Sequence, residues 1–358
     1  MKKESLIRHI AILLALAVCC SCIPQEQPSG TGGVSLVFEA SSFTRAVTPG
    51  DGTAADGGGI ARTTADPDKP DLWVFLVSDD DDEIKARYPG SGMTDGQLHA
   101  GFTALRDTVS FQGLADGPYT VYAFANTEGL ALTGSPDLGT VSDRDDLDDL
   151  LFAALGTTPG TDTISLQANR LPLAATAPLT VTENNNGSTT VEMVRCLAKI
   201  TVEMINQTTE TLSMPEHLGD PGLSITLHKM NPNQGYVFEH TPDIPLAAYD
   251  PGPSGDVEYA CNTTIAAGDT LKLVRYVFPS DTLRCGPFTT DVSFYLAGDD
   301  ETYSYTDLPI IDYRARHLAQ LARNTHLHLE IRVSRKKRVS FNFRVEEWNN
   351  VSSTVTFE

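Results

Sequence analysis

Basic residues are scarce in this sequence of 358 residues, where 26 Lys and Arg stand against 47 Asp and Glu and give a formal net charge of −21. So acidic a chain argues against nucleic-acid binding, because the phosphates of nucleic acids require a basic protein face. The motifs GxSxG, GxGxxG, the Walker loop and HExxH are also missing. We therefore predict neither enzymatic activity nor a cofactor or metal.

No hydrophobic run is long enough to span a bilayer, which takes about 20 apolar residues. The longest run near the start, Ile10–Val18, follows a basic segment and has the length of the hydrophobic region of an export signal. Cysteines follow at once, and this arrangement resembles a bacterial lipoprotein cleavage site. Cys22, which follows Ser21, fits the lipidated position better than Cys19 or Cys20. We predict a lipoprotein signal peptide over the first 21 residues, with an ordinary signal peptide as the alternative.

Cysteine is rare in the rest of the chain, with only Cys196, Cys261 and Cys285 after Cys22. An exported protein can form a disulfide, but three cysteines leave one over. No Cys/His spacing typical of a metal site is present. Buried thiols are the simplest interpretation, and a disulfide between two of them stays open.

Residues 22–71 contain one short strand between two linkers. Residues 23–33 are rich in Pro, Gly and Gln and predict a flexible tether. Apolar and polar residues then alternate over 34–41, which predicts a strand, and residues 47–71 offer almost nothing to bury. An isolated strand is not stable, so this one must pair with another part of the fold.

The region 72–195 is predicted to form a first β-sandwich. Continuously apolar Leu72–Val77 indicates a strand covered on both faces, and residues 113–118 have the composition of a turn. Further strands are predicted at Val109–Phe111 and Tyr119–Asn126, a helix at Asp143–Leu155, and a hairpin that joins Leu179–Thr182 to Thr189–Met193.

The apolar positions change from odd to even numbers near Arg195 without a turn, which indicates a bulge or a strand that passes from one sheet to another. We place a domain boundary there and predict a second sandwich over 196–358. Turn spacing favours antiparallel sandwiches. Its strands are predicted at Leu223–Leu227, Thr270–Phe278, Thr290–Leu296, 326–333 and Val339–Val345, with Val355 and Phe357 closing the chain.

Three polar clusters could carry chemistry, but each has a simpler structural explanation. His326 and His328 share one face of a strand, where solvent-facing histidines are more common than a metal site. The acidic runs 78–83 and 143–149 lack the spacing of a calcium loop and suit a hairpin tip and a helix start. The basic run Arg335–Arg338 suits a charged hairpin turn.

Several segments are informative when they are taken together, namely 72–79, 117–126, 171–173, 194–202, 321–325, 345–349 and 355–357. In this order and spacing they resemble the fimbrillins of Bacteroidales, which are lipoprotein subunits of type V pili. The resemblance implies two tandem transthyretin-like antiparallel β-sandwich domains with a short helical insertion, and no enzymatic activity.

The resemblance also implies a use for the isolated strand, taken as Val34–Phe43. In such pilins a trypsin-like or arginine-specific protease removes an N-terminal strand, and a C-terminal strand of another subunit replaces it. Carried over to this chain, the expected cleavage lies between Arg45 and Ala46, with Arg62 as the alternative, unless Arg45 is a linker residue that is never cut. The donor region would be 339–358, with its apolar residues at Val339, Phe341, Phe343, Val345, Val355 and Phe357.

We therefore predict a structural subunit of a surface fimbrium, lipid-anchored to the outer membrane through Cys22 as a precursor, which binds other pilus subunits and supports adhesion to host or bacterial surfaces. A pilus anchor, a tip adhesin and a surface glycan-binding lipoprotein are the alternatives. Charge supports head-to-tail contact, because residues 34–195 carry 9 basic and 24 acidic groups whereas 196–358 carry 14 and 21.

Overall fold

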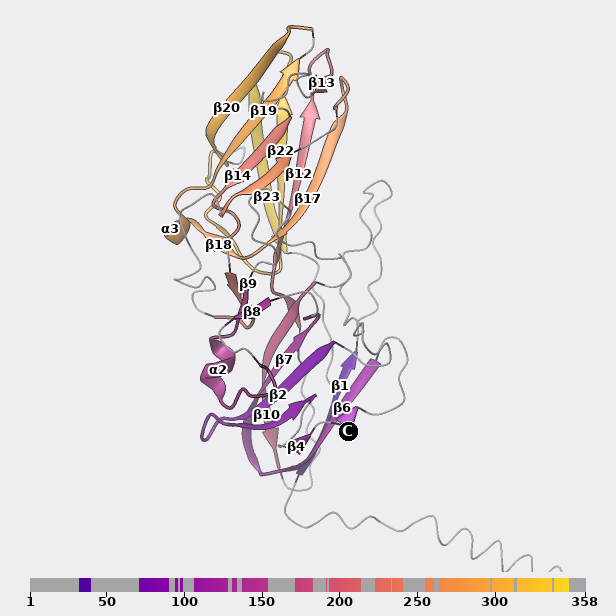
Figure 1. Cartoon of the computed structure of the whole chain (residues 1–358), viewed down its shortest axis with the longest axis vertical. Helices are drawn as coiled ribbons and strands as arrows, with labels where there is room; N and C mark the ends of the chain where they lie inside the picture. Colours follow the sequence, from indigo (N-terminus) through magenta and orange to yellow (C-terminus); the bar gives the residue numbers. More distant parts are fainter. Residues whose placement is uncertain are drawn as a thin grey trace, which may run out of the picture.

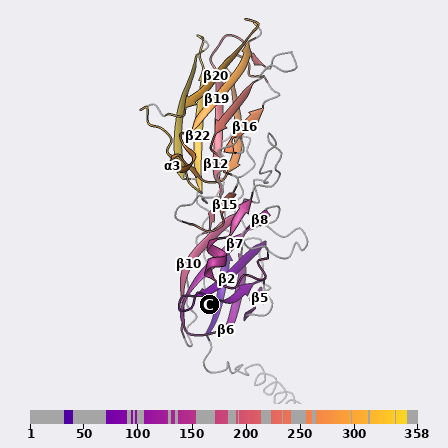
Figure 2. The ribbon, with the colours of Figure 1, turned by 60° about the vertical axis from the view of Figure 1, so that its left-hand side comes forward.

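The computed structural model describes residues 32–39, 71–89, 94–95, 97–98, 106–127, 131–133, 137–153, 171–182, 191, 193–213, 223–232, 234–240, 255–260, 264–296, 298–311, 314–336 and 338–347. The chain is all-β and forms two sandwiches stacked along the long axis of the molecule (Figure 1, Figure 2). Within the described residues, no helix is both long and apolar enough to cross a membrane.

The first sandwich, in the lower lobe of Figure 1, packs a three-stranded sheet on a six-stranded one. The three-stranded sheet has the order β1-β6-β5, with β1 Gly32–Glu39, β6 Arg106–Leu114 and β5 Gln97–Leu98. The six-stranded sheet has the order β11-β10-β7-β2-β3-β4, with β11 Val194–Arg195, β10 Leu173–Val181, β7 Gly117–Ala125, β2 Leu72–Ser78, β3 Ile84–Tyr88 and β4 Thr94–Asp95. The isolated strand predicted from the sequence therefore does pair, and its partner is β6.

Two separate apolar clusters cover the two faces of β2. Val74 and Leu76 lie in the core between the two sheets, whereas Phe75 and Val77 lie in a second cluster on the opposite face. This confirms the prediction of a strand buried on both faces, because β2 is central in its sheet and is covered from both sides.

The second sandwich, in the upper lobe, has a four-stranded and a five-stranded sheet. The four-stranded sheet has the order β17-β12-β22-β23, with β17 Thr270–Val277, β12 Ala198–Asn206, β22 Thr325–Val333 and β23 Val339–Glu347. The other sheet contains β13 Leu212–Ser213, β19 Thr289–Leu296, β14 Ser224–His228, β16 Val257–Ala260 and β20 Glu301–Pro309. The basic run lies in the β22–β23 turn, as predicted, and the Ser334 amide donates to the Arg338 carbonyl at 2.9 Å.

The chain passes from one sheet to another at the change of phase, since β11 pairs with β10 whereas β12 pairs with β17 and β22. The pairing of β12 with β22 is parallel, unlike the antiparallel pairing that the turn spacing predicted. Whether the two halves are independent domains with a boundary at 195/196 stays a prediction.

The junction between the lobes combines residues from both halves. β9 (Leu151–Ala153) pairs with β8 (Ala131–Thr133) on one side and with β15 (Gln234–Tyr236), from the second half of the chain, on the other. The second cluster on β2 continues here, with Phe152, Val237, Phe238 and Phe278 all buried. A short sheet of β18 (Ser280–Asp281) and β21 (Gln320–Leu321), followed by helix α3 (Thr282–Cys285), lies at the base of the upper lobe.

The helix predicted at 143–155 is wrong in its extent, because α2 spans only Arg144–Asp148 and the chain is a strand again at β9. Asp143 caps the helix, and its carboxylate accepts from the Asp146 amide at 3.0 Å. The helix ends early because Phe152 is fully buried in the junction and β9 pairs on both edges.

The hairpin predicted over 179–193 is also wrong in part. Val191 and Met193 are buried, but neither lies in a strand, and residues 183–190 lie outside the described residues. The strand that joins β10 is β11, which pairs with Leu173 and Ala174 at the other end of β10.

Candidate functional site

The first candidate site is the position of β1 in the lower sandwich. β1 is antiparallel to β6 along its whole length, from Gly32 opposite Leu114 to Glu39 opposite Arg106. Leu36 lies opposite Val109 and is 0% exposed. The Leu36 side chain therefore forms part of the core of the lower lobe.

β1 is an edge strand, since among the described residues its only ladder partner is β6. The chain continues from β1 into residues 40–70, which lie outside the described residues, and enters the sandwich again at β2. Loss of β1 would expose the backbone N–H and C=O groups of β6 that pair with it. It would also open the space that Leu36 fills beside Val109 and Phe111 in the core.

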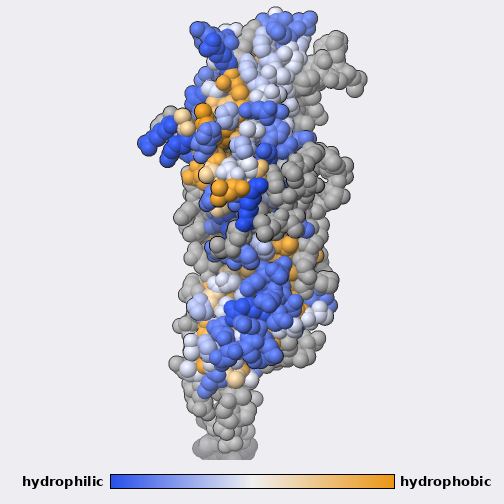
Figure 3. Space-filling model, turned by 90° about the vertical axis from the view of Figure 1, so that its left-hand side faces the viewer, coloured by the Kyte–Doolittle hydropathy of each residue, from blue (hydrophilic) through white to orange (hydrophobic). Residues whose placement is uncertain are grey.

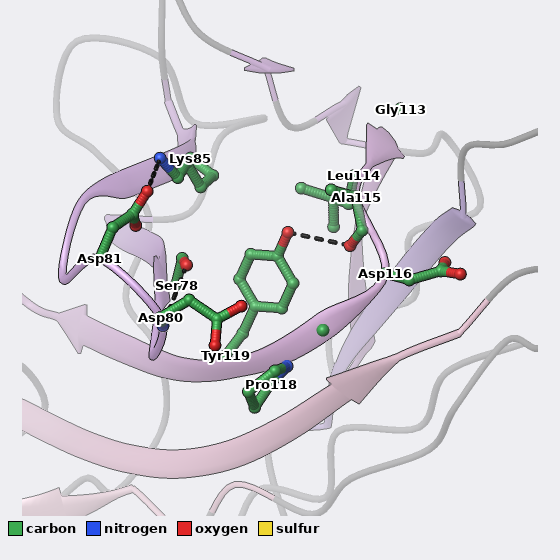
Figure 4. Close-up of a pocket in the computed structure, with 11 residues that line it drawn as sticks. Ser78, Asp80, Asp81, Lys85, Gly113, Leu114, Ala115, Asp116, Pro118 and Tyr119 are labelled. Atoms are coloured by element: carbon green, nitrogen blue, oxygen red, sulfur yellow. Dashed lines mark hydrogen bonds and ion pairs between the residues drawn. The ribbon is translucent and has the colours of Figure 1, made fainter.

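A pocket of about 480 Å³ lies at the end of the groove where β1 begins. It opens between the β2–β3 hairpin and the β6–β7 turn, and Leu114, which pairs with Gly32, is part of its wall (Figure 4). Tyr119 lies at its centre and donates from its hydroxyl to the Ala115 carbonyl at 3.0 Å. Burial raises the pKa of Tyr119, so the ring is held as a neutral phenol.

The wall of the pocket carries three aspartates and one lysine: Asp80, Asp81, Asp116 and Lys85. Lys85 Nζ pairs with Asp81 Oδ2 at 2.6 Å, and this hydrogen bond lowers the pKa of Asp81. Asp80 and Asp116 are exposed. The sequence analysis predicted an acidic hairpin tip and a turn here but missed the pocket, because only the fold brings 78–85 beside 113–119.

The second candidate site is β23, which contains the first four predicted donor residues. β23 is the last strand of its sheet and, within the described part of the chain, pairs only with β22. Val339, Phe341 and Phe343 pack half-buried against the upper core, whereas Val345 is 42% exposed. Leu283 of α3 is 96% exposed, and Figure 3 shows apolar side chains gathered along one side of the upper lobe.

The other predicted site residues fall where the structure is not described. These are Cys22, Arg45, Ala46, Arg62, Val355, Phe357 and Cys261. Of the remaining cysteines, Cys196 and Cys285 are buried, and the Cys196 thiol donates to the Val237 carbonyl at 3.3 Å.

Contrary to the prediction, the two histidines do not face solvent. His326 is half-buried, its Nε2 lies 2.8 Å from Thr201 Oγ1, and its ring lies 3.7 Å from that of His328. Burial, followed by the charges of His328 and Lys199, lowers the pKa of His326 to about 3. No group of three or more potential metal ligands occurs among the described residues.

Comparison with known proteins agrees with this architecture. The family model described as "Fimbrillin-A associated anchor proteins Mfa1 and Mfa2" matches residues 104–354. No curated protein matches. Crystal structures of putative cell adhesion proteins from Parabacteroides distasonis and Bacteroides eggerthii are similar in fold, with TM-scores of 0.54 and 0.51 and sequence identities of 13% and 12%. Each similarity covers 90% of this chain and 98% of the other. The tip fimbrial protein Mfa3 from Porphyromonas gingivalis matches more loosely, with a TM-score of 0.49 and 13% identity over 89% of this chain and 100% of that one.

The two stacked sandwiches and the family match together define a β-sandwich protein of a fimbrial family. The family model covers well over half of the chain, and the chain belongs to the family of Fimbrillin-A associated anchor proteins Mfa1 and Mfa2. The resemblance to Bacteroidales fimbrillins is thereby confirmed.

Proposed function

We propose that this chain is a fimbrial subunit that polymerises by exchange of β1 for the β23 region of another copy. In the proposal, the chain is exported as a lipoprotein through Cys22, reaches the outer membrane, and is cut after Arg45. The observation that carries the proposal is β1 itself, an edge strand that is joined to the sandwich by the ladder with β6, contributes the fully buried Leu36 to the core, and is followed in the sequence by Arg45.

The pairing of β1 supports this proposal in energetic terms. Burial of Leu36 contributes about 1.5–3 kcal/mol to the attachment of β1, in addition to its ladder with β6. An incoming strand gains the same ladder of hydrogen bonds and can place an apolar side chain where Leu36 lies. β23 suits the donor role because its apolar residues Val339, Phe341 and Phe343 recur at every second position.

The experiment compares the chain without its signal peptide with the variants Arg62→Ala and Arg45→Ala/Arg62→Ala, each treated with an arginine-specific protease. We expect the parent and Arg62→Ala to form detergent-resistant ladders, with Arg62→Ala beginning at Ala46, whereas Arg45→Ala/Arg62→Ala stays monomeric. Monomers from the cut parent chain would refute the polymerising role.

The description of the matching family as anchor proteins favours one alternative, a pilus anchor that keeps β1. An anchor would carry an acylated Cys22 and an intact Arg45–Ala46 bond on the cell surface. N-terminal sequencing of the surface-exposed protein separates the two roles, because a start at Ala46 excludes the uncut anchor.

Glycan binding has no comparable support among the described residues. It would need exposed aromatic side chains, but Trp73 is half-buried and stacks on Phe75 with ring centroids 6.1 Å apart.

A further inference from the structure

The pocket at the β6–β7 turn is continuous with the groove of β1. Gly32, the first residue of β1, lies opposite Leu114, and Leu114 is also part of the pocket wall. A strand that took the place of β1 in the same direction, with a few more residues before it, would therefore pass directly across the pocket.

β1 and β23 share one apolar pattern. Val34-Ser35-Leu36 in β1 corresponds to Val339-Ser340-Phe341 in β23, and apolar residues follow two positions later at Phe38 and Phe343. Aligned in this way, Phe341 takes the place of Leu36 opposite Val109 of β6. The four residues before β23 then fall at and beyond the start of β1, beside the pocket.

The flanks of the two strands differ in charge. The residues before Val34 are Gly30-Thr31-Gly32-Gly33, which are neutral, whereas those before Val339 are Arg335-Lys336-Lys337-Arg338. Arg335, Lys336 and Arg338 are exposed. The β6–β7 turn, which forms part of the pocket wall, lies at the end of the lower lobe far from the junction, and the β22–β23 turn lies at the far end of the upper lobe (Figure 1). Head-to-tail stacking of two copies would therefore bring the two turns together.

The charge of the pocket is suited to such a flank. Asp80 lies close to the backbone at Gly117, where its Oδ2 would be 3.5 Å from an added Cβ, and Asp116 is the residue just before Gly117 in the β6–β7 turn. Within the part of the chain that the structure describes, no basic side chain is paired with Asp80 or Asp116, since Lys85 pairs with Asp81 and Glu83.

We propose that the basic flank Arg335–Arg338 of one copy docks in the acidic pocket of a second copy and there favours the donor strand over β1. The inference rests on the proposed strand exchange and adds a direction to it, because the flank of β1 beside the pocket, residues 30–33, carries no charge. The attraction between exposed charges is modest at each contact, and together the contacts favour the basic flank by about tenfold at low salt.

The test uses the full chain with a specific protease site between Arg45 and Ala46, cut so that a dye-labelled β1 fragment remains bound. Two peptides compete with the fragment, and its release is followed by fluorescence anisotropy. One peptide is residues 335–347, and the other carries Gly-Thr-Gly-Gly, the natural flank of β1, in place of Arg335–Arg338. We expect the basic peptide to displace the fragment at about tenfold lower concentration in low salt, and the difference to vanish in 1 M salt.

The double variant Asp80→Asn/Asp116→Asn should abolish the difference, whereas the control Asp145→Asn/Asp149→Asn, which removes two exposed acids on α2 and its C-cap, should preserve it. Equal potency of the two peptides would overturn the docking inference and leave strand exchange intact. A difference that survives in Asp80→Asn/Asp116→Asn would overturn the assignment of the pocket. Failure of both peptides to displace β1 would refute strand exchange and the inference with it.

Discussion

Leu36 is the residue through which the attachment of β1 can be measured. It is 0% exposed, and its side chain lies in the core with Val109 and Phe111. Replacement by alanine removes the packing of the buried leucine and leaves a cavity, which costs about 2–5 kcal/mol in such positions. If that cost falls on the bound state of β1, the dissociation rate of a cut β1 fragment rises by about 30-fold to several thousand-fold, because each ~0.59 kcal/mol changes the rate by a factor of e.

The assay follows the release of the labelled fragment after cleavage at Arg45, in Leu36→Ala and in the unmodified chain. Leu227→Ala is the matched control, because Leu227 is equally buried but lies in the core of the upper lobe. It should destabilise the chain in urea without changing fragment release. Release from Leu36→Ala at the unmodified rate, or equal acceleration in Leu227→Ala, would refute the view that burial of Leu36 helps to hold β1 in place.

Three further predictions concern the rest of the fold. Burial lowers the pKa of His228, but the hydrogen bonds and charges of Asp256 and Asp291 outweigh this effect and raise the pKa. The ion pairs therefore stabilise the fold below pH 6.5. We expect about 1 kcal/mol of the free energy of unfolding to be lost as the pH rises through the raised pKa. His228→Gln should flatten that dependence in urea unfolding, and a parallel pH profile would refute this assignment. Gly235→Ala places a methyl group against the Phe278 ring, and it should lower stability by about 1–3 kcal/mol. Arg144→Ala removes two half-exposed ion pairs and should cost about 1 kcal/mol or less, a loss that high salt in the parent chain should reproduce.

The strands that could be predicted are those whose pattern is local. Leu72–Val77, Tyr119–Asn126 and 326–333 each carry their own apolar periodicity, so β2, β7 and β22 were predicted to within a few residues. The periodicity also predicted either a bulge or a change of sheets near Arg195, and the structure shows the change of sheets. These strands form because one or both of their faces are buried, and the order of apolar and polar residues in the sequence shows which faces those are.

The elements that could not be predicted depend on partners far along the chain. Leu151–Ala153 has a composition that suits a helix, but β15 of the second half and β8 pair with it on both edges. The partner of β1, the parallel neighbours β12 and β22, and the pocket all arise from segments separated by 30 to more than 100 residues. Sequence periodicity says that a strand has a buried face, but it does not say which strand lies beside it.

The parallel pair of β12 and β22 has a mechanical consequence for any fibre joined as proposed. Tension would reach the upper lobe through the start of β12, which is connected to the lower lobe, and through the end of β22, which leads into β23. These two points lie at opposite ends of a ladder that runs in register from Lys199 opposite His326 to Asn206 opposite Val333. The pull would therefore act along the strands and load all the hydrogen bonds of the ladder at once, rather than opening them one after another from an end. Because the lifetime of a protein under force depends on how fast it unfolds, this geometry would let each subunit bear load as a stiff link in the fibre.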